Sequence, residues 1–287
     1  MKPAGSPIWM GDAASALREA ALILAEVSDS PRLDAELLMA HALQMERSEL
    51  LLKLPELKAL AEFSTLIERR QQSEPIAHII GKKEFWGLDF QVTPDVLIPR
   101  PDSELLIEEA VRIFASAHPY RIVDLGTGSG ALLLATLHEF PEAKGLGMDA
   151  SAAALQIAHN NADALGLADR AKFLLLDWTL RDWTGSLGSG FDLILANPPY
   201  VATRARLSAD VANFEPHQAL FAGEQGLDDY RIIIPALEKL LSPTGTALLE
   251  IGFDQANPVS EIAIKSGYHV ELKQDLGSND RLLVLRR

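Results

Sequence analysis

Cysteine is missing from this chain of 287 residues. Its absence excludes disulfide bonds, catalysis by a thiolate and zinc sites with cysteine ligands. The seven histidines are scattered, with no two within one helical turn and none paired with a glutamate at the spacing of zinc ligands. The composition therefore predicts no metal site.

Long apolar runs are missing too. No segment approaches the length of a membrane span, and the first eleven residues lack the basic segment and following apolar run of a secretory signal. We therefore expect a cytoplasmic protein without membrane contact. Hydrophobic residues make up 48% and charged residues 23%, which indicates a soluble globular chain long enough for two domains.

Positive charge is scarce, with 26 lysines and arginines against 40 aspartates and glutamates, for a net charge of −14. Nucleic-acid binding depends mainly on neutralising phosphates, so this balance argues against general affinity for nucleic acid. Two small basic groups, Arg69-Arg70 and Arg204 with Arg206, are exceptions. We interpret both first as solvated faces of a helix or loop.

Three regions follow one another along the chain. Residues 1–72 form a predicted helical domain, with Asp12 and the Ser30-Pro31 pair as start signals and helices throughout from residue 12. Residues 73–100 are predicted as a β-hairpin linker, and residues 101–287 as the largest domain. The helical domain carries no catalytic cluster, so we interpret it as a module for substrate recognition. The linker prediction rests on extended segments at residues 76–80, 84–86 and 89–92.

In the largest domain, short apolar strands alternate with helices. The predicted strands cover residues 121–125, 143–148, 171–176, 191–196, 246–251, 268–273 and 281–285. This alternation predicts a mostly parallel seven-stranded sheet with helices on both faces, in a Rossmann-like α/β domain. A short turn joins the last two strands, so we expect a hairpin there and one antiparallel strand.

A glycine-rich turn follows the first predicted strand and opens a helix. It runs from Gly126 through Thr127, Gly128 and Ser129 to Gly130. Glycines allow a sharp turn, a close ligand and free N–H groups that face the ligand. The turn also satisfies the dinucleotide pattern G-x-G-x-x-A through Ala131, which leaves a nicotinamide-dependent oxidoreductase open.

Carboxylates around this turn favour S-adenosylmethionine over a dinucleotide. Asp124 precedes the turn, where a carboxylate suits the amino-acid end of a sulfonium cofactor and would repel a pyrophosphate. Asp149 ends the next strand and can accept hydrogen bonds from ribose hydroxyls. Asp177 and Trp178 follow the third strand and can flank adenine. In the alternative interpretation, Asp124 caps a turn and Trp178 is ordinary core.

The most informative segment is Asn197-Pro198-Pro199-Tyr200, which follows the predicted strand at residues 191–196. Two prolines stop the strand and make a rigid corner. The Asn197 side-chain oxygen and the Pro198 carbonyl can then accept both hydrogens of an NH2 group, while Tyr200 stacks on the planar group behind it. We take Asn197, Pro198 and Tyr200 as catalytic candidates and all four residues as substrate-binding candidates. The alternative is an ordinary strand-ending turn.

Together these motifs resemble the protein-(glutamine-N5) methyltransferases of peptide chain release factors, the PrmC/HemK family. The resemblance covers nearly the whole length and includes the blocks Leu33 to Leu38, Glu74 to Gly81, Phe85 to Leu88, Leu97 to Pro101, Gly226 to Asp228 with Tyr230-Arg231, and Leu249 to Gly252. Two departures are mild: Asp102-Ser103-Glu104 stands where the family usually has Glu-Thr-Glu, and Ala196 where serine is common.

The resemblance implies that residues 126–130, Asp149, Trp178 and Asn197 contact S-adenosylmethionine, whose product is S-adenosylhomocysteine. It implies that residues 197–200 hold the glutamine of the Gly-Gly-Gln loop in class-1 release factors, so that methylation tunes translation termination. The helical domain would dock against another part of that substrate, and we expect the enzyme to be a monomer.

Two further alternatives remain at this point. The tetrapeptide also occurs in amino-methylating enzymes of the adenine N6 type that act on nucleic acid, although such an enzyme should carry a basic cleft. A non-catalytic binding module would be expected to have lost one of the two motifs. Glu215 and His217 are interpreted as shaping the substrate entrance, and Glu250 as making a structural hydrogen bond.

Overall fold

The computed structural model describes Trp9 and residues 11–287. Its residues divide into two compact units. The first comprises the chain up to Lys82 together with Leu207–Phe214, and the second comprises Lys83–Arg206 with Glu215–Arg287. Most of the N-terminal segment in which we expected no secretory signal lies outside the described residues. In the described part of the chain, no helix is both long and apolar enough to span a membrane.

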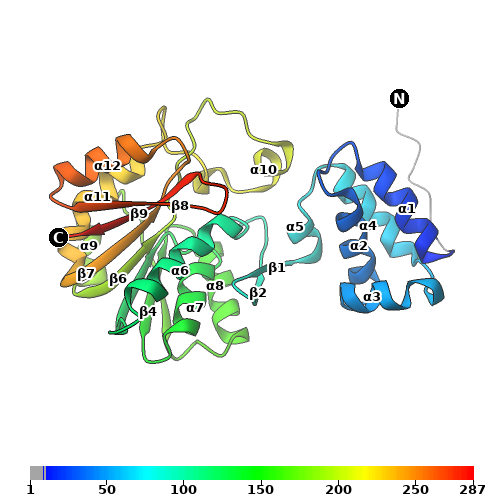
Figure 1. Ribbon diagram of the computed structural model, residues 1–287, viewed down its shortest axis with the longest axis horizontal. Helices are drawn as coiled ribbons and strands as arrows, with labels where there is room; N and C mark the ends of the chain where they lie inside the picture. Colours follow the sequence, from blue (N-terminus) through cyan, green and yellow to red (C-terminus); the bar gives the residue numbers. More distant parts are fainter. Residues whose placement is uncertain (1–8, 10) are drawn as a thin grey trace. The chain divides into compact units, whose positions relative to one another are not determined.

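Helices make up the first unit (Figure 1). They are α1 (Ala13–Leu24), α2 (Pro31–Ala42), α3 (Arg47–Lys53), α4 (Ala61–Gln71), the short α5 (Ile76–Ile80) and, from the later segment, α10 (Ala209–Phe214). Both expected start signals are confirmed, because Asp12 accepts a 2.9 Å hydrogen bond from the Ser15 N–H and Pro31 is the first residue of α2. The core is formed by fully buried apolar side chains, among them Leu17, Leu24, Leu38, Met39, Phe63 and Ile67.

Two local predictions in this unit are wrong. Residues 76–80 form helix α5 and not a strand, because Pro75 starts the turn and Gly81, at φ 82°, ends it. The helices also do not continue through residues 57–59. This segment is extended, since the Leu57 carbonyl accepts a hydrogen bond from the Ala13 N–H and the Ala59 N–H donates to the Gly11 carbonyl. Pairing with residues distant in sequence outweighs local helix propensity here.

The second unit contains the predicted seven-stranded sheet. Its strands are β3 (Arg121–Leu125), β4 (Lys144–Asp149), β5 (Ala171–Leu175), β6 (Phe191–Ala196), β7 (Leu241–Glu250), β8 (His269–Gln274) and β9 (Asp280–Arg286). They lie in the order β5-β4-β3-β6-β7-β9-β8. Only β9 runs against its neighbours, pairing antiparallel with both β7 and β8. A small separate hairpin, β1 (Lys82–Phe85) with β2 (Leu88–Gln91), precedes the sheet.

Helices cover both faces of this sheet (Figure 1). Alternate strand residues point to opposite faces, so Ile122 of β3 belongs to one core and Val123 to the other. One core takes in α6 (Glu104–Ile113), α7 (Ala131–Glu139) and α8 (Ala152–Ala164), and the other takes in α9 (Trp183–Leu187), α11 (Asp228–Leu240) and α12 (Ala256–Lys265). The chain order reverses around β3, and ligands of such sheets bind beyond the carboxyl ends of the strands at this point.

Candidate functional site

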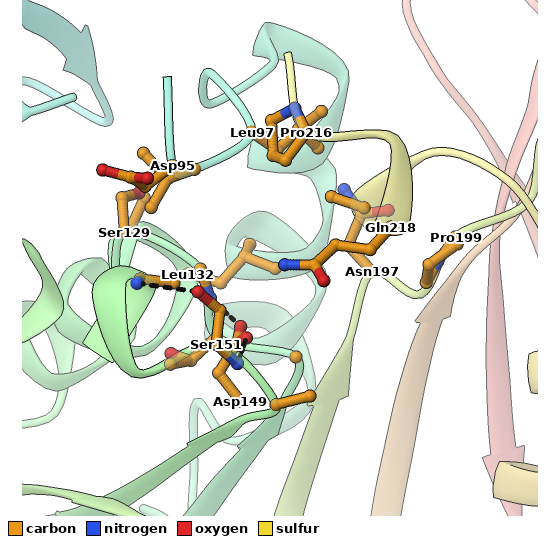
Figure 2. Close-up of a pocket in the computed structure, with 18 of the residues that line it drawn as sticks. Asp95, Leu97, Ser129, Leu132, Asp149, Ser151, Asn197, Pro199, Pro216 and Gln218 are labelled. Atoms are coloured by element: carbon orange, nitrogen blue, oxygen red, sulfur yellow. Dashed lines mark hydrogen bonds between the residues drawn. The ribbon is translucent and has the colours of Figure 1, made fainter. Parts of the chain in front are cut away.

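A cavity of about 390 Å³ lies at the expected place, beyond the carboxyl ends of β3 to β6. Each of these strands contributes to its wall where it ends: Gly126 follows β3, Asp149 ends β4, Asp177 comes shortly after β5 and Asn197 follows β6. In Figure 2, Asp149 and Ser151 lie at the lower side of the cavity and Asn197 and Gln218 at its right. The topology therefore brings the glycine-rich turn and the tetrapeptide to one cavity.

The glycine-rich turn needs its glycines. Gly126, Gly128 and Gly130 have φ angles of 78°, 54° and 81°, in the left-handed region that side chains rarely adopt. The turn is anchored to the neighbouring strand β4, because the N–H groups of Gly126 and Thr127 both donate to the Met148 carbonyl, at 2.9 and 2.8 Å. The Gly130 N–H donates to the Thr127 carbonyl at 2.8 Å.

We expected the N–H groups of this turn to be free to face a ligand. This expectation is wrong for Gly126, Thr127, Gly128 and Gly130, whose N–H groups all have partners within the protein. The Gly128 N–H donates to Asp149 Oδ2 at 2.8 Å, and the Ser151 N–H donates to Asp149 Oδ1 at 2.9 Å. Both bonds fix the Asp149 carboxylate at the cavity wall, and its oxygens keep lone pairs for further donors such as hydroxyls. With four of its five N–H groups engaged, the turn offers few donors to a pyrophosphate, which counts against the dinucleotide interpretation.

Asp124 is buried beneath this turn and does not line the cavity. Its Oδ2 accepts a 2.7 Å hydrogen bond from the hydroxyl of Thr127, a lining residue, while Oδ1 has no partner among the described residues. Burial raises the pKa of Asp124 to about 7, and the neighbouring Asp149 adds to the rise. A nearby cation would relieve the cost of this buried carboxylate.

Trp178 contributes to both the cavity and the core. Its indole N–H donates to Asp229 Oδ1 at 2.7 Å, and the ring lies so close to Gly126 that a Cβ there would come within 3.1 Å of it. Burial raises the pKa of Asp229, and the hydrogen bond from Trp178 offsets part of this rise. The sequence did not indicate Asp229 as a site residue, because its partner Trp178 lies 51 residues away in the chain.

The tetrapeptide presents only part of itself to the cavity. Asn197 and Pro199 line it, whereas Pro198 is buried and neither it nor Tyr200 is among the lining residues described. The Asn197 Nδ2 donates to Ser103 Oγ at 3.2 Å. The Tyr200 hydroxyl donates to Glu250 Oε1 at 3.4 Å. Burial raises the pKa of Tyr200 to about 12.

An ion pair with Glu215 holds Arg100, which lines the cavity. Glu215 is buried and accepts hydrogen bonds from Arg100 Nη2 at 2.6 Å and from the Ile98 N–H at 3.3 Å. Glu215 is itself outside the lining, and its role in shaping the substrate entrance stays a prediction. Leu97 and Pro99, from the block at residues 97–101, also line the cavity, and further lining residues that the sequence did not point to are Asp95, Val96, Pro216, Gln218, Ala219 and Phe221.

The charge of the wall is strongly one-sided. The lining includes four aspartates, Asp95, Asp149, Asp177 and Asp229, and a single arginine, Arg100, which is paired with Glu215. Such a wall attracts a cationic ligand and repels a phosphate.

Sheet order, switch point and cavity together define a Rossmann-like α/β domain with a ligand cavity at its switch point. Solved structures share the fold: the hMettl16 catalytic domain in complex with a MAT2A 3'UTR hairpin has a TM-score of 0.55, with 18% identity over 70% of this chain and 76% of that one. A methyltransferase from Pyrococcus furiosus has a TM-score of 0.51, with 19% identity over 71% of this chain and 90% of that one.

Sequence comparisons identify the chain as a methyltransferase and show the family to which it belongs. The PrmC N-terminal domain family matches residues 15–81, and the methyltransferase small domain family matches residues 101–216. A release factor glutamine methyltransferase from Caulobacter vibrioides is 40% identical over 89% of each chain. One from Bradyrhizobium diazoefficiens is 37% identical over 100% of this chain and 99% of its own. The chain belongs to the family of release factor glutamine methyltransferases.

Proposed function

We propose that this protein transfers a methyl group from S-adenosylmethionine to the side-chain amide nitrogen of the glutamine in the Gly-Gly-Gln loop of a class-1 peptide chain release factor. The observation that carries the proposal is that Asn197 and the glycine-rich turn line one cavity. The names of the relatives support the choice of a release factor as substrate.

The residues at the glycine-rich end fit S-adenosylmethionine, which supplies an electrophilic methyl group on a sulfonium. Asp149 would accept hydrogen bonds from ribose hydroxyls, and Asp177 and Trp178 would flank adenine. Asp124, buried beneath the turn and outside the lining, would favour the ammonium group of the amino-acid end by its charge, and its Oδ1 has no partner among the described residues. The acidic wall fits a cationic cofactor for the same electrostatic reason.

At the other end, Asn197 would hold the glutamine. An amide nitrogen is a poor nucleophile because its lone pair is delocalised into the carbonyl. The Asn197 Oδ1 and the Pro198 carbonyl would accept its two N–H bonds and direct the lone pair toward the methyl group. Both bonds would strengthen as the nitrogen becomes positive, which stabilises the transition state more than the bound substrate.

No side chain need act as a strong base in this reaction. The nitrogen–carbon bond forms as the carbon–sulfur bond breaks, the bonding electrons stay on sulfur, and the nitrogen then loses a proton to water. In this scheme Tyr200 would stack on the amide plane, and its hydroxyl bond to Glu250 would fix the ring. The helical unit would recognise another part of the release factor.

The direct test is to incubate the protein with S-adenosylmethionine and a purified class-1 release factor and to analyse the peptides by mass spectrometry. We expect the peptide with the loop glutamine to become heavier by one CH2 group. An RNA hairpin and duplex DNA, assayed with labelled methyl donor, serve as comparison substrates. Methylation of either nucleic acid in place of the release factor would refute the proposal.

A further inference from the structure

A polar cluster of Ser103 and Glu250 lies beside Asn197, and Ser103 lines the cavity with it. Ser103 comes from a short 3₁₀ turn, η2 (Pro101–Ser103), and Glu250 is the last residue of β7. Both are buried, with exposed fractions of 3% for Ser103 and 0% for Glu250. The Ser103 Oγ lies 2.5 Å from Glu250 Oε2 and 3.2 Å from the Asn197 Nδ2.

With Glu250 ionised, the donors and acceptors of this cluster fit together in one direction. The Asn197 Nδ2 can only donate, so the Ser103 oxygen accepts from it. The single Ser103 proton is then available for Glu250, and an ionised carboxylate can only accept. The Tyr200 hydroxyl donates to the other oxygen of the same carboxylate. The hydrogen bonds therefore run from Asn197 through Ser103 to Glu250.

This direction determines which end of the Asn197 amide is available for a ligand. With Nδ2 held by Ser103, the Asn197 Oδ1 has no hydrogen-bond partner among the described residues. Asn197 lines the cavity, so this oxygen is an acceptor for an incoming NH2 group. A reversed amide would present its own NH2 group to the substrate NH2 group, and two donors cannot pair.

We propose that Ser103 and Glu250 are positioning residues that hold the Asn197 amide with its oxygen toward the substrate amide nitrogen. The proposal rests on the proposed function, because it assigns the group that this oxygen binds. It also gives the buried Glu250 carboxyl group a role at a place where its charge is costly. Burial raises the pKa of Glu250, and hydrogen bonds from Ser103 and Tyr200 offset only part of that rise.

Variants of Ser103 test the proposal. Ser103→Ala removes the link, and we expect kcat with the release factor to fall about 30-fold, as for the loss of one oriented polar contact. The affinity for S-adenosylhomocysteine, measured by calorimetry, should stay within about twofold. Ser103→Thr keeps the hydroxyl and should recover most of the lost rate. Ser103→Cys has a similar volume and a weaker acceptor, and should fall between the two.

Ser186→Ala changes an exposed serine of α9 and serves as the matched control, with the wild-type rate expected. A wild-type kcat in folded Ser103→Ala would overturn the proposal. So would an equal loss of rate and of cofactor affinity in all three Ser103 variants, because that pattern marks a merely structural role.

A measurement without the substrate separates this proposal from the proposed function. The side-chain NH2 signals of Asn197 can be identified by NMR from their loss in Asn197→Ala, with S-adenosylhomocysteine bound. We expect Ser103→Ala to speed the exchange of these protons with water, whereas unchanged exchange would refute the link. If the wild type methylated no release factor but this exchange still rose, the proposed function would fail while the hydrogen-bonded link would stand.

Discussion

The two ends of the cavity are built in opposite ways. At the cofactor end, one continuous turn from Gly126 to Gly130 provides the shape, and the bonds that fix it span at most 32 residues, as from Ser129 to Asn161. At the substrate end, Asn197 is held by Ser103, which lies 94 residues away, and Ser103 is held by Glu250, a further contact across 147 residues. Local backbone conformation builds the first end, and long-range side-chain contacts build the second.

The strongest test of this division is Asn197→Ala. We expect kcat to fall about 1,000-fold, because an oriented group that stabilises developing charge is lost. Cofactor affinity, measured by calorimetry with S-adenosylhomocysteine, should change little if the two ends are separate. Asn257→Ala, an exposed asparagine in α12, is the matched control. An Asn197→Ala enzyme within a few-fold of the wild-type rate would contradict the proposed role of the amide.

The substrate end should also give a pH-dependent stability. Burial raises the pKa of Glu250 from 4.5 to about 7, so the folded protein holds this proton over a pH range in which the unfolded chain has lost it. The contribution of Glu250 to the unfolding free energy should be most favourable below pH 4.5 and fall by about 3 kcal/mol as the pH rises to 7. The charged or titratable groups around it are Arg281, Asp102, Tyr200 and Tyr230.

Denaturant unfolding of the wild type and Glu250→Gln from pH 4.5 to 8 measures this contribution. The glutamine variant has no proton to lose, so it should become the more stable protein relative to wild type as the pH rises. A difference between the two proteins that stays constant across this range would show that the Glu250 carboxyl is not the titrating group.

Gly126→Ala sharpens the comparison at the cofactor end. The residue has a φ of 78°, and a new Cβ would meet the Trp178 ring at 3.1 Å. We expect a loss of about 2 kcal/mol in stability and about tenfold weaker binding of S-adenosylhomocysteine. Gly185→Ala, in α9 with open space around it, is the control and should keep the wild-type affinity. Equal behaviour of both variants would show that the turn does not depend on its glycine.

The smallest expected effect concerns Trp178. Asp229→Ala removes the acceptor of the indole N–H and should weaken S-adenosylhomocysteine binding about threefold, since one partly exposed hydrogen bond is lost. Asp229→Asn keeps an acceptor and should bind more tightly than the alanine variant. Calorimetry distinguishes the two, and identical affinities would show that Trp178 needs no such support.

The same division explains what the sequence could reveal. The bounds of β3 and β6 are as predicted, because each strand is a short apolar run that ends at a clear turn signal. The glycine-rich turn and Asn197 were identified for the same local reason. Helix α5 was mistaken for a strand, because its isoleucines favour extended structure while the flanking Pro75 and Gly81 set a helical turn.

Ser103 and the pair of Arg100 with Glu215 could not be derived from local patterns. Their partners lie 94 to 147 residues away, and nothing in a five-residue window marks a serine as a link to a distant carboxylate. The only available signal was the resemblance of the surrounding blocks to the family. The predicted domain bounds and the roles of Pro198 and Tyr200 remain predictions.

The acidic wall of the cavity affects which adenosine-containing molecules can bind there. Adenosine phosphates share a nucleoside with the proposed methyl donor and could in principle compete for its place. Four aspartates line the wall, and four of the five backbone N–H groups of the glycine-rich turn are already engaged, so a triphosphate would be repelled and would find few compensating contacts. We therefore expect the protein to select its methyl donor partly by repelling adenosine triphosphate.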